Sequence, residues 1–107
     1  MNQVYVRPEL RVLEEKEILT RINSLPGWTY KNNKISKEFT FKKFMDVVAF
    51  VVKLAPFCEA NDHHPDMHIS YKKVLFELQR FDLGGKVTDM DFKEAEYIEQ
   101  LFKEWNP

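Results

Sequence analysis

Hydrophobic residues in the first third of the chain follow helical spacing and then strand spacing. Pro8 suits the first position of a helix, and a helical stripe follows it up to Leu25-Pro26-Gly27: Leu10, Leu13, Ile18, Leu19 and Ile22. From Trp28 to Phe41, hydrophobic and polar residues then alternate on both sides of Asn32-Asn33. Alternation around two turn-tolerant asparagines predicts a β-hairpin.

A second helix is predicted directly after this hairpin. Thr40 can serve as its N-cap, and hydrophobic residues recur every three or four positions: Phe44, Val47, Val48, Val51, Leu54, Ala55 and Cys58. The run from Val47 to Val52 also fits a buried strand, but the periodic segment is too long for one. Pro56 removes a helical hydrogen bond, so we expect a bend there with a last turn beyond it.

Alternation returns in a second predicted hairpin. Its first strand carries Met67, Ile69 and Tyr71, and its second carries Val74, Phe76 and Leu78. The same alternation extends to Phe81 and places it on the polar face of the second strand. Gly84-Gly85 is expected to break that strand.

A third helix completes the pattern. Thr88 and Asp91 resemble a capping box with Asp in place of Glu, and a helical stripe follows: Phe92, Ala95, Ile98, Phe102 and Trp105. The order helix, hairpin, helix, hairpin, helix predicts an α+β fold, with a four-stranded, mainly antiparallel sheet and three helices packed on one face. Because no linker, repeat or low-complexity tract interrupts the 107 residues, we expect residues 1–107 to form a single domain.

Composition and charge narrow the classes of function. A chain that is 44% hydrophobic and 31% charged is not a disordered one, and its net charge of -1 offers no basic field for nucleic acid. Residues 1–57 carry a net charge of +4 and residues 58–107 one of -5, which is compatible with self-association. No apolar run approaches the roughly 18 residues of a membrane span. The single cysteine, Cys58, and the absence of a signal-peptide pattern predict a cytoplasmic protein.

All three histidines fall within residues 63–68, and a metal site is one interpretation of them. It would use His63, His64 and His68 with Asp62 or Glu59 as carboxylate ligand. Adjacent histidines on an irregular loop do not point reliably at one ion, and Pro65 prevents a helical pairing of His64 with His68. We therefore expect no metal.

Two further interpretations of the histidines stay open on the residues alone. In the structural one, His63 and His64 cap the end of the second helix, and Pro65 stops it. In the catalytic one, an imidazole exchanges protons near neutral pH, while Glu59 or Asp62 sets its tautomer or stabilises its charge.

The spacing of these residues favours the catalytic interpretation. The pattern Glu59-x3-His63-His64-Pro65-x5-Tyr71 resembles the pterin-4a-carbinolamine dehydratase family. The resemblance extends over roughly residues 19–102 and continues after Tyr71 through further matching positions: Leu78, the aromatic at Phe81, Asp82, Gly84-Gly85, Thr88 and Asp91. It implies an α+β sheet covered by helices, in agreement with the fold predicted above.

The resemblance also implies an activity and roles for individual residues. The family removes water from a 4a-hydroxy-tetrahydropterin, and the product is the quinonoid dihydropterin of tetrahydrobiopterin recycling. The reaction needs an acid and a base but no metal or redox cofactor. His63 would be a general acid/base, His64 would contact the pterin and its hydroxyl, and Glu59 would orient the pair. Pro65 would fix the loop. His68 matches no catalytic position, and we expect it to be solvated at the rim.

Phe81 and Asp82 would join His64 and Pro65 in binding the substrate. Phe81 departs from the family pattern, which has histidine or tryptophan there. Phenylalanine cannot transfer a proton, which lowers the rate by about 10²–10⁴ if two histidines share the chemistry, but its ring can stack on a pterin. Arg80 replaces the usual threonine, and one extra residue lies between Gly85 and Asp91.

The resemblance also supplies expected partners. It implies a pterin substrate made by an aromatic amino acid hydroxylase, and a homodimer or homotetramer in which open sheet edges are covered. Relatives serve as the dimerisation cofactor of a homeodomain transcription factor and as an assembly factor for RuBisCO. The alternative function is therefore a protein-binding module with weak or no catalysis.

Overall fold

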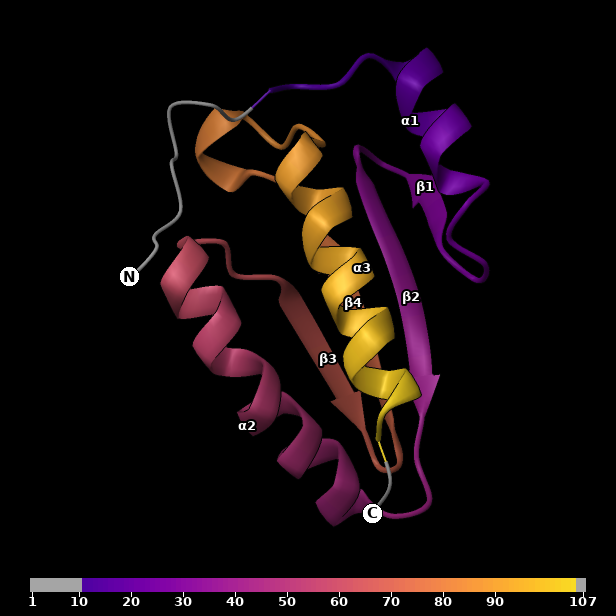
Figure 1. Ribbon diagram of the computed structural model, residues 1–107, viewed down its shortest axis with the longest axis vertical. Helices are drawn as coiled ribbons and strands as arrows, with labels where there is room; N and C mark the ends of the chain where they lie inside the picture. The colour runs from indigo at the N-terminus through magenta and orange to yellow at the C-terminus, as the bar shows by residue number, and fades with distance from the viewer. Residues whose placement is uncertain (1–10, 106–107) are drawn as a thin grey trace.

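The computed structural model describes residues 11–105, apart from the side chain of Phe81. Three helices and two hairpins follow one another in the predicted order (Figure 1): α1 (Glu15–Ile22), β1 (Thr29–Lys31), β2 (Lys34–Thr40), α2 (Phe44–Asn61), β3 (Asp66–Ser70), β4 (Lys73–Leu78), the short 3₁₀ helix η2 (Phe81–Leu83) and α3 (Asp89–Lys103). The element order expected from the hydrophobic pattern is confirmed.

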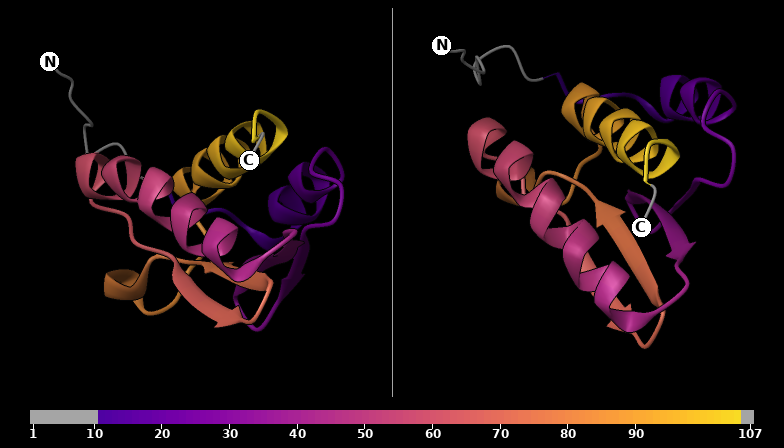
Figure 2. Two further views of the ribbon diagram at one scale, coloured as in Figure 1. Left: turned by 90° about the horizontal axis from the view of Figure 1, so that it is seen from below. Right: turned by 60° about the horizontal axis from the view of Figure 1, so that its bottom comes forward.

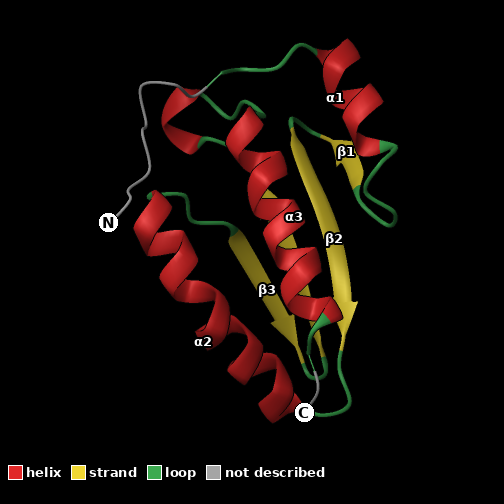
Figure 3. Ribbon diagram, viewed as in Figure 1, coloured by secondary structure: helices red, strands yellow, loops and turns green. Residues whose placement is uncertain are grey.

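The four strands form one sheet in the order β1-β2-β4-β3, and each neighbouring pair is antiparallel. Figure 3 shows β1, β2 and β3 in yellow, with β4 largely hidden behind α3. The three helices lie together on one face of this sheet (Figure 2). The α+β architecture is therefore confirmed. Its central pair, β2 and β4, joins the two hairpins, so segments far apart in sequence are aligned in the middle of the sheet.

Both hairpin turns use residues with left-handed backbone. Asn32 and Asn33 have φ angles of 54° and 63°, the pair of positive values that a tight two-residue hairpin turn requires. Between β3 and β4 the turn starts at Tyr71, whose φ is 55°. Tyr71, expected on a strand, therefore belongs to the turn.

The core lies between the sheet and the helices. The inward positions of β2 and β4 are buried, as the alternation predicts, and the apolar stripes of α2 and α3 cover them: Ile35, Phe39, Val74, Phe76, Leu78, Val47, Phe50, Leu54, Ala95 and Ile98. Phe39 packs against Phe50 and Phe76, with ring centroids 6.4 and 5.8 Å away. This aromatic centre anchors α2 to the sheet.

The first helix begins later than predicted. Pro8 and Leu10 lie outside the described residues, and Leu13 precedes α1, which starts at Glu15. The Leu13 N–H donates to the Val87 carbonyl oxygen at 3.0 Å, and Val12 forms an isolated β-bridge with Thr88. Leu13 is thus buried as part of an extended segment that pairs with the residues before α3, and it does not belong to a helix.

The predicted Thr40 cap is also wrong. Thr40 is the last residue of β2, and the sheet pairing continues past it, because the Phe41 N–H donates to the Lys72 carbonyl at 2.8 Å. Helix α2 therefore starts only at Phe44, with Lys43 at the N-cap and no side-chain capping bond. The helix includes Pro56, and the last turn predicted beyond it is present.

The segment after β4 differs most from the prediction. The strand ends at Leu78, so Phe81 is not on its polar face but starts η2. The chain folds back around Arg80, whose N–H donates to the Lys86 carbonyl at 2.8 Å, and Gly84 and Gly85 take φ angles of 77° and 75° in this turn.

Helix α3 begins with the predicted capping box. The Asp91 side chain accepts a hydrogen bond from the Thr88 N–H, and the Thr88 side chain accepts one in return from the Asp91 N–H. An aspartate in place of glutamate therefore closes the box. Trp105 lies just beyond the helix and packs against the core from there.

Candidate functional site

The site starts at the C-terminal end of α2, where the chain leaves the helix through a left-handed residue. Asp62 has a φ of 49°, and the His63 N–H donates to the Cys58 carbonyl at 3.0 Å. Backbone groups thus cap this end of the helix, and the two imidazole rings are used elsewhere. His63 turns inward and is 3% exposed, whereas the side chain of His64 is 54% exposed.

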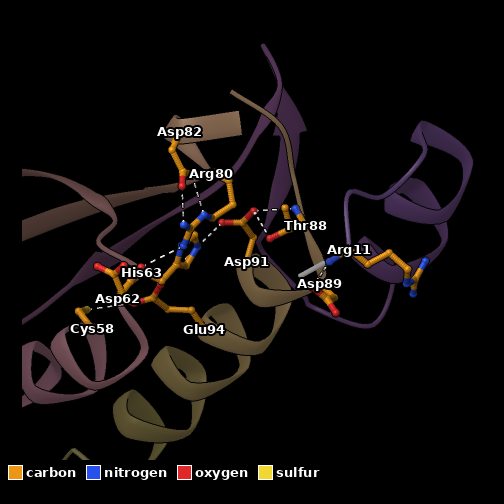
Figure 4. Close-up of polar contacts among 10 residues, drawn as sticks. All are labelled: Arg11, Cys58, Asp62, His63, Arg80, Asp82, Thr88, Asp89, Asp91 and Glu94. Carbon is orange, nitrogen blue, oxygen red and sulfur yellow. Dashed lines mark hydrogen bonds and ion pairs between the residues drawn. The ribbon is translucent and has the colours of Figure 1, made fainter. Parts of the chain in front are cut away.

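The ring of His63 is held at both nitrogens. Its Nε2 lies 2.5 Å from Oδ1 of Asp91, and its Nδ1 lies 3.2 Å from Nη1 of Arg80 (Figure 4). The other oxygen of Asp91 accepts from the N–H and the hydroxyl of Thr88, at 2.7 and 3.2 Å. One carboxylate therefore joins the first turn of α3 to the histidine at the end of α2.

Arg80 occupies the opposite side of the ring and is itself buried. Its Nε and Nη2 pair with the two carboxylate oxygens of Asp82 at 3.1 and 2.9 Å, and its Nη1 also donates to the Asp62 carbonyl at 2.9 Å. The sequence marks Arg80 only as a departure from a family pattern. Its place in the site could not be seen there, because the turn that directs it inward is irregular.

His64 has a different partner. Its Nε2 lies 2.7 Å from Oε1 of Glu59, one helical turn back on α2, and both side chains are exposed. The structure brings Glu59 to His64, while His63 is held by Asp91 and Arg80. An exposed imidazole within hydrogen-bond distance of a carboxylate can donate and accept protons.

Two hollows flank His64. One, of about 300 Å³, is lined by Asp62, His63, His64, Gln79, Arg80 and Asp82. The other, of about 240 Å³, is lined by His64, Asp66, Glu77 and Gln79. His64 and Gln79 belong to both, so they stand on the ridge between them.

The remaining predicted binding residues are placed as follows. Asp82 lines the larger hollow and is exposed, and Pro65 is half-buried between His64 and β3. The side chain of Phe81 lies outside the part of the chain that the structure describes. Gln79 was missed by sequence reasoning, and only its position, directly after the last residue of β4, indicates that it could face the site.

A buried acid lies beneath His63. Glu94 is fully buried on α3, its Oε2 accepts from the Cys58 thiol at 3.0 Å, and its Oε1 is 3.7 Å from His63 Nε2. Burial raises the pKa of Glu94 to about 7, and burial together with the nearby Glu94 raises the pKa of the Cys58 thiol. The available indication in the sequence was an acid three residues after Asp91, next to the apolar stripe of the last helix.

His68 stands apart from this network. Its Nε2 lies 3.0 Å from Oε1 of Glu77, and this bond, with a second from Lys34, lowers the pKa of Glu77. His63, His64 and His68 thus each pair with a different carboxylate.

Within residues 11–105, no group of three or more His, Cys, Asp or Glu side chains is arranged to hold a metal ion. None of the described helices is both long and apolar enough to cross a membrane.

The fold and the adjacent histidines beside an open hollow agree with a protein of the pterin dehydratase class, and comparison with known sequences shows this class. Residues 11–101 match the profile described as "Pterin 4 alpha carbinolamine dehydratase". The chain belongs to the pterin-4-alpha-carbinolamine dehydratase family. This confirms the family resemblance seen in the spacing of the histidine motif.

Two relatives illustrate the similarity. The chain is 43% identical over 89 residues to a "Putative pterin-4-alpha-carbinolamine dehydratase" of Sulfolobus acidocaldarius. The aligned region covers 83% of this chain and 97% of the relative. A protein of Picosynechococcus with the same description is also 43% identical, over 83% of this chain and 96% of the relative.

Solved structures share the fold. A Brucella melitensis protein described as a transcriptional coactivator/pterin dehydratase matches with a TM-score of 0.79 and 29% identity, over 85% of this chain and 98% of that one. A pterin dehydratase-like protein described as a RuBisCO assembly factor of the α-carboxysome matches with a TM-score of 0.55 and 23% identity, over 69% and 84% of the two chains. The second likeness concerns the fold alone.

Proposed function

We propose that this protein dehydrates 4a-hydroxytetrahydrobiopterin, or a close pterin-4a-carbinolamine, to the quinonoid dihydropterin and water. The observation that carries the proposal is the 2.7 Å pair of His64 and Glu59 between two open hollows. Family membership supports the same chemistry. The reaction neither oxidises nor reduces the pterin, so it needs proton transfer and no cofactor.

One exposed histidine can serve both proton transfers in turn. The His64 imidazolium first donates a proton to the 4a-hydroxyl group, the C4a–O bond breaks, and water leaves as the N5 lone pair forms a C4a=N5 bond. The neutral imidazole then takes the proton from N5, which yields the quinonoid product and restores the imidazolium. Glu59 holds the ring in place and stabilises the positive charge that forms on it in the second step. This cycle proceeds without a histidine at position 81.

His63 has a supporting role in this proposal. Both of its ring nitrogens are already engaged, by Asp91 and Arg80, and the ring is almost fully buried. It lines the larger hollow as a fixed wall. Pro65 restricts the loop that carries His64, and Phe81 and Asp82 contribute to pterin binding, Phe81 by stacking.

Cellular context follows from the chemistry. The substrate arises where a tetrahydropterin is hydroxylated at C4a, so an aromatic amino acid hydroxylase is the proposed supplier and tetrahydrobiopterin recycling is the proposed setting. We place the protein in the cytoplasm with this pathway.

The proposal is tested by the rate of carbinolamine dehydration in the wild type, in His64→Gln and in His63→Gln. We expect His64→Gln to lower kcat by at least about 10²-fold, as loss of a general acid/base does. His63→Gln keeps a donor for Asp91 and is expected to lose no more than about tenfold. A wild-type rate equal to the uncatalysed rate would exclude the activity. A larger loss in His63→Gln than in His64→Gln would reverse the two roles.

We also propose self-association, through the exposed face of α2. Met45 and Val52, two turns apart on this helix, are 64% and 65% exposed, and the helix is apolar on most of its circumference. In addition, β3 pairs only with β4 among the described strands, so its other edge is open. A second copy of the chain covers both kinds of surface in a homodimer or homotetramer.

The alternative function, a protein-binding module, rests on the same surface.

Self-association is tested by light scattering, and the wild type is expected to give a multiple of the 12.8 kDa chain mass. Val52→Lys should shift the mass toward the monomer, whereas Val12→Lys, at another exposed valine, should not. A monomeric wild type with a co-purifying protein and no dehydration would favour the module.

A further inference from the structure

Arg80 is the most constrained charged side chain of the site. It is 5% exposed and contacts three residues from two parts of the chain: the Asp82 carboxylate through Nε and Nη2, and the Asp62 carbonyl and His63 Nδ1 through Nη1. Figure 4 shows the guanidinium between Asp82 and the ring of His63. Its plane is therefore fixed by several bonds at once.

The chemistry of these contacts defines the proton on His63. A guanidinium has only donors, so the Nδ1 atom 3.2 Å from Arg80 must be the acceptor. The neutral ring then carries its hydrogen on Nε2, which faces Asp91 Oδ1 at 2.5 Å. Asp91 accepts there, as it does from Thr88 with its other oxygen. All the contacts agree with one tautomer.

Without Arg80, the charges around the ring would favour a second proton. On the α3 side Asp91 contacts the ring, whereas Glu94, bonded to the Cys58 thiol of α2, adds negative charge only above its pKa of about 7. On the other side Asp62 precedes the ring and Asp82 lies behind Arg80. His64, next in the chain, is bonded to Glu59. Arg80 is the positive group that directly contacts His63 and presents an N–H where that second proton would be added.

We propose that Arg80 is a positioning residue that holds His63 as a neutral imidazole with its one proton on Nε2, and so leaves proton exchange with a ligand to His64. The assignment of proton exchange to His64 rests on the proposed dehydration, whereas the neutral state of His63 does not. The family resemblance has threonine at this position and so does not itself imply this arrangement.

The test counts ring protons by ¹⁵N–¹H correlation in protein with ¹⁵N-labelled histidine, without substrate, at about pH 6, where an ordinary imidazole is largely protonated. Signals of His64 and His68 are assigned from His64→Gln and His68→Gln. In the wild type we expect one proton on His63, at Nε2. In Arg80→Gln, which removes the charge and opens Nδ1 to water, we expect a second proton at Nδ1.

Arg80→Lys keeps a charged donor, and we expect it to keep the single proton on His63. Arg21→Gln removes an equal charge from α1, and we expect it to show the wild-type pattern. A proton on Nδ1 of His63 in the wild type overturns the proposal, and so does a single Nε2 proton in a folded Arg80→Gln. If Arg80→Gln does not fold, Arg80→Met, which also removes the charge and the donor, takes its place in the comparison. Because no turnover is measured, a protein without dehydratase activity that gives the expected proton counts would refute the proposed function and keep this inference.

Discussion

Oδ1 of Asp91 lies 2.5 Å from Nε2 of His63, although 28 residues separate them. The same carboxylate closes the capping box of α3 through Thr88. A group that starts a helix thus also fixes a ring of the candidate site. Changes at Asp91 should therefore affect both the stability of the fold and the site.

Asp91→Asn should destabilise the fold by about 2–3 kcal/mol. The amide has one acceptor and one donor side where the carboxylate accepts from both His63 and Thr88, so a buried donor loses its partner. Urea denaturation measures this. Asp89→Asn, in the same helical turn but without a contact to His63, should cost less than about 1 kcal/mol. Equal losses in the two variants would contradict a special role of Asp91.

Glu94→Gln should change how stability depends on pH. The folded state raises the pKa of Glu94 from 4.5 to about 7, so folding takes up a proton between these values. The contribution is fully present below pH 4.5 and is lost as pH rises through 7, at most about 3 kcal/mol. Glutamine cannot titrate, so Glu94→Gln should gain on the wild type between pH 5 and pH 8 in denaturation experiments.

The control for this prediction is Glu96→Gln, at an exposed carboxylate of the same helix. Its difference in stability from the wild type should stay constant over that range. A constant difference for Glu94→Gln as well would show that the carboxyl group is not titrating there.

Glu59→Gln should lower kcat by up to about fivefold and leave KM within about twofold. It removes the negative charge beside His64, and an ion pair between two exposed side chains contributes about 0.2–1 kcal/mol. Steady-state dehydration kinetics measure it, and the melting temperature should not change. Glu38→Gln, at an exposed carboxylate of β2, serves as the control and should behave as the wild type.

Phe81→His should raise kcat by at least about tenfold. The family pattern has histidine or tryptophan at this position, and a second acid/base group can contribute a factor of about 10²–10⁴. Phe81→Trp provides an aromatic ring without proton transfer and should leave kcat within about threefold of the wild type. A gain in both variants would indicate an effect of packing and not of proton transfer.

Phe50→Ala should destabilise the fold by about 3–5 kcal/mol, because Phe50 is fully buried and packs against Phe39 and Phe76. Phe44→Ala, at a phenylalanine of the same helix that is 45% exposed, should cost less than about 1.5 kcal/mol. Thermal or chemical denaturation distinguishes the two. Similar losses would contradict the assignment of the core.

Local patterns predicted the elements because each has a local cause. Asn32-Asn33 predicted the first turn since both residues tolerate left-handed backbone, and Thr88 with Asp91 predicted the start of α3 since the capping box needs only residues within one turn. The start of α1 and the end of β4 were misplaced because backbone pairing with groups outside each element decides them. Leu13 pairs with Val87, and Arg80 pairs with Lys86 across the Gly84-Gly85 turn.

The sequence by itself determined the α+β order, the family and the position of the histidine motif, because periodicity and spacing are properties of short segments. Only the tertiary structure decided which partners each histidine has. A left-handed residue, Asp62, turns His63 into the protein and His64 toward solvent. His63 is then held by Arg80, which follows β4, and by Asp91 of α3, whereas His64 contacts Glu59 of α2. Two adjacent residues of one type therefore have different environments, because burial and hydrogen-bond partners depend on the packing of distant segments.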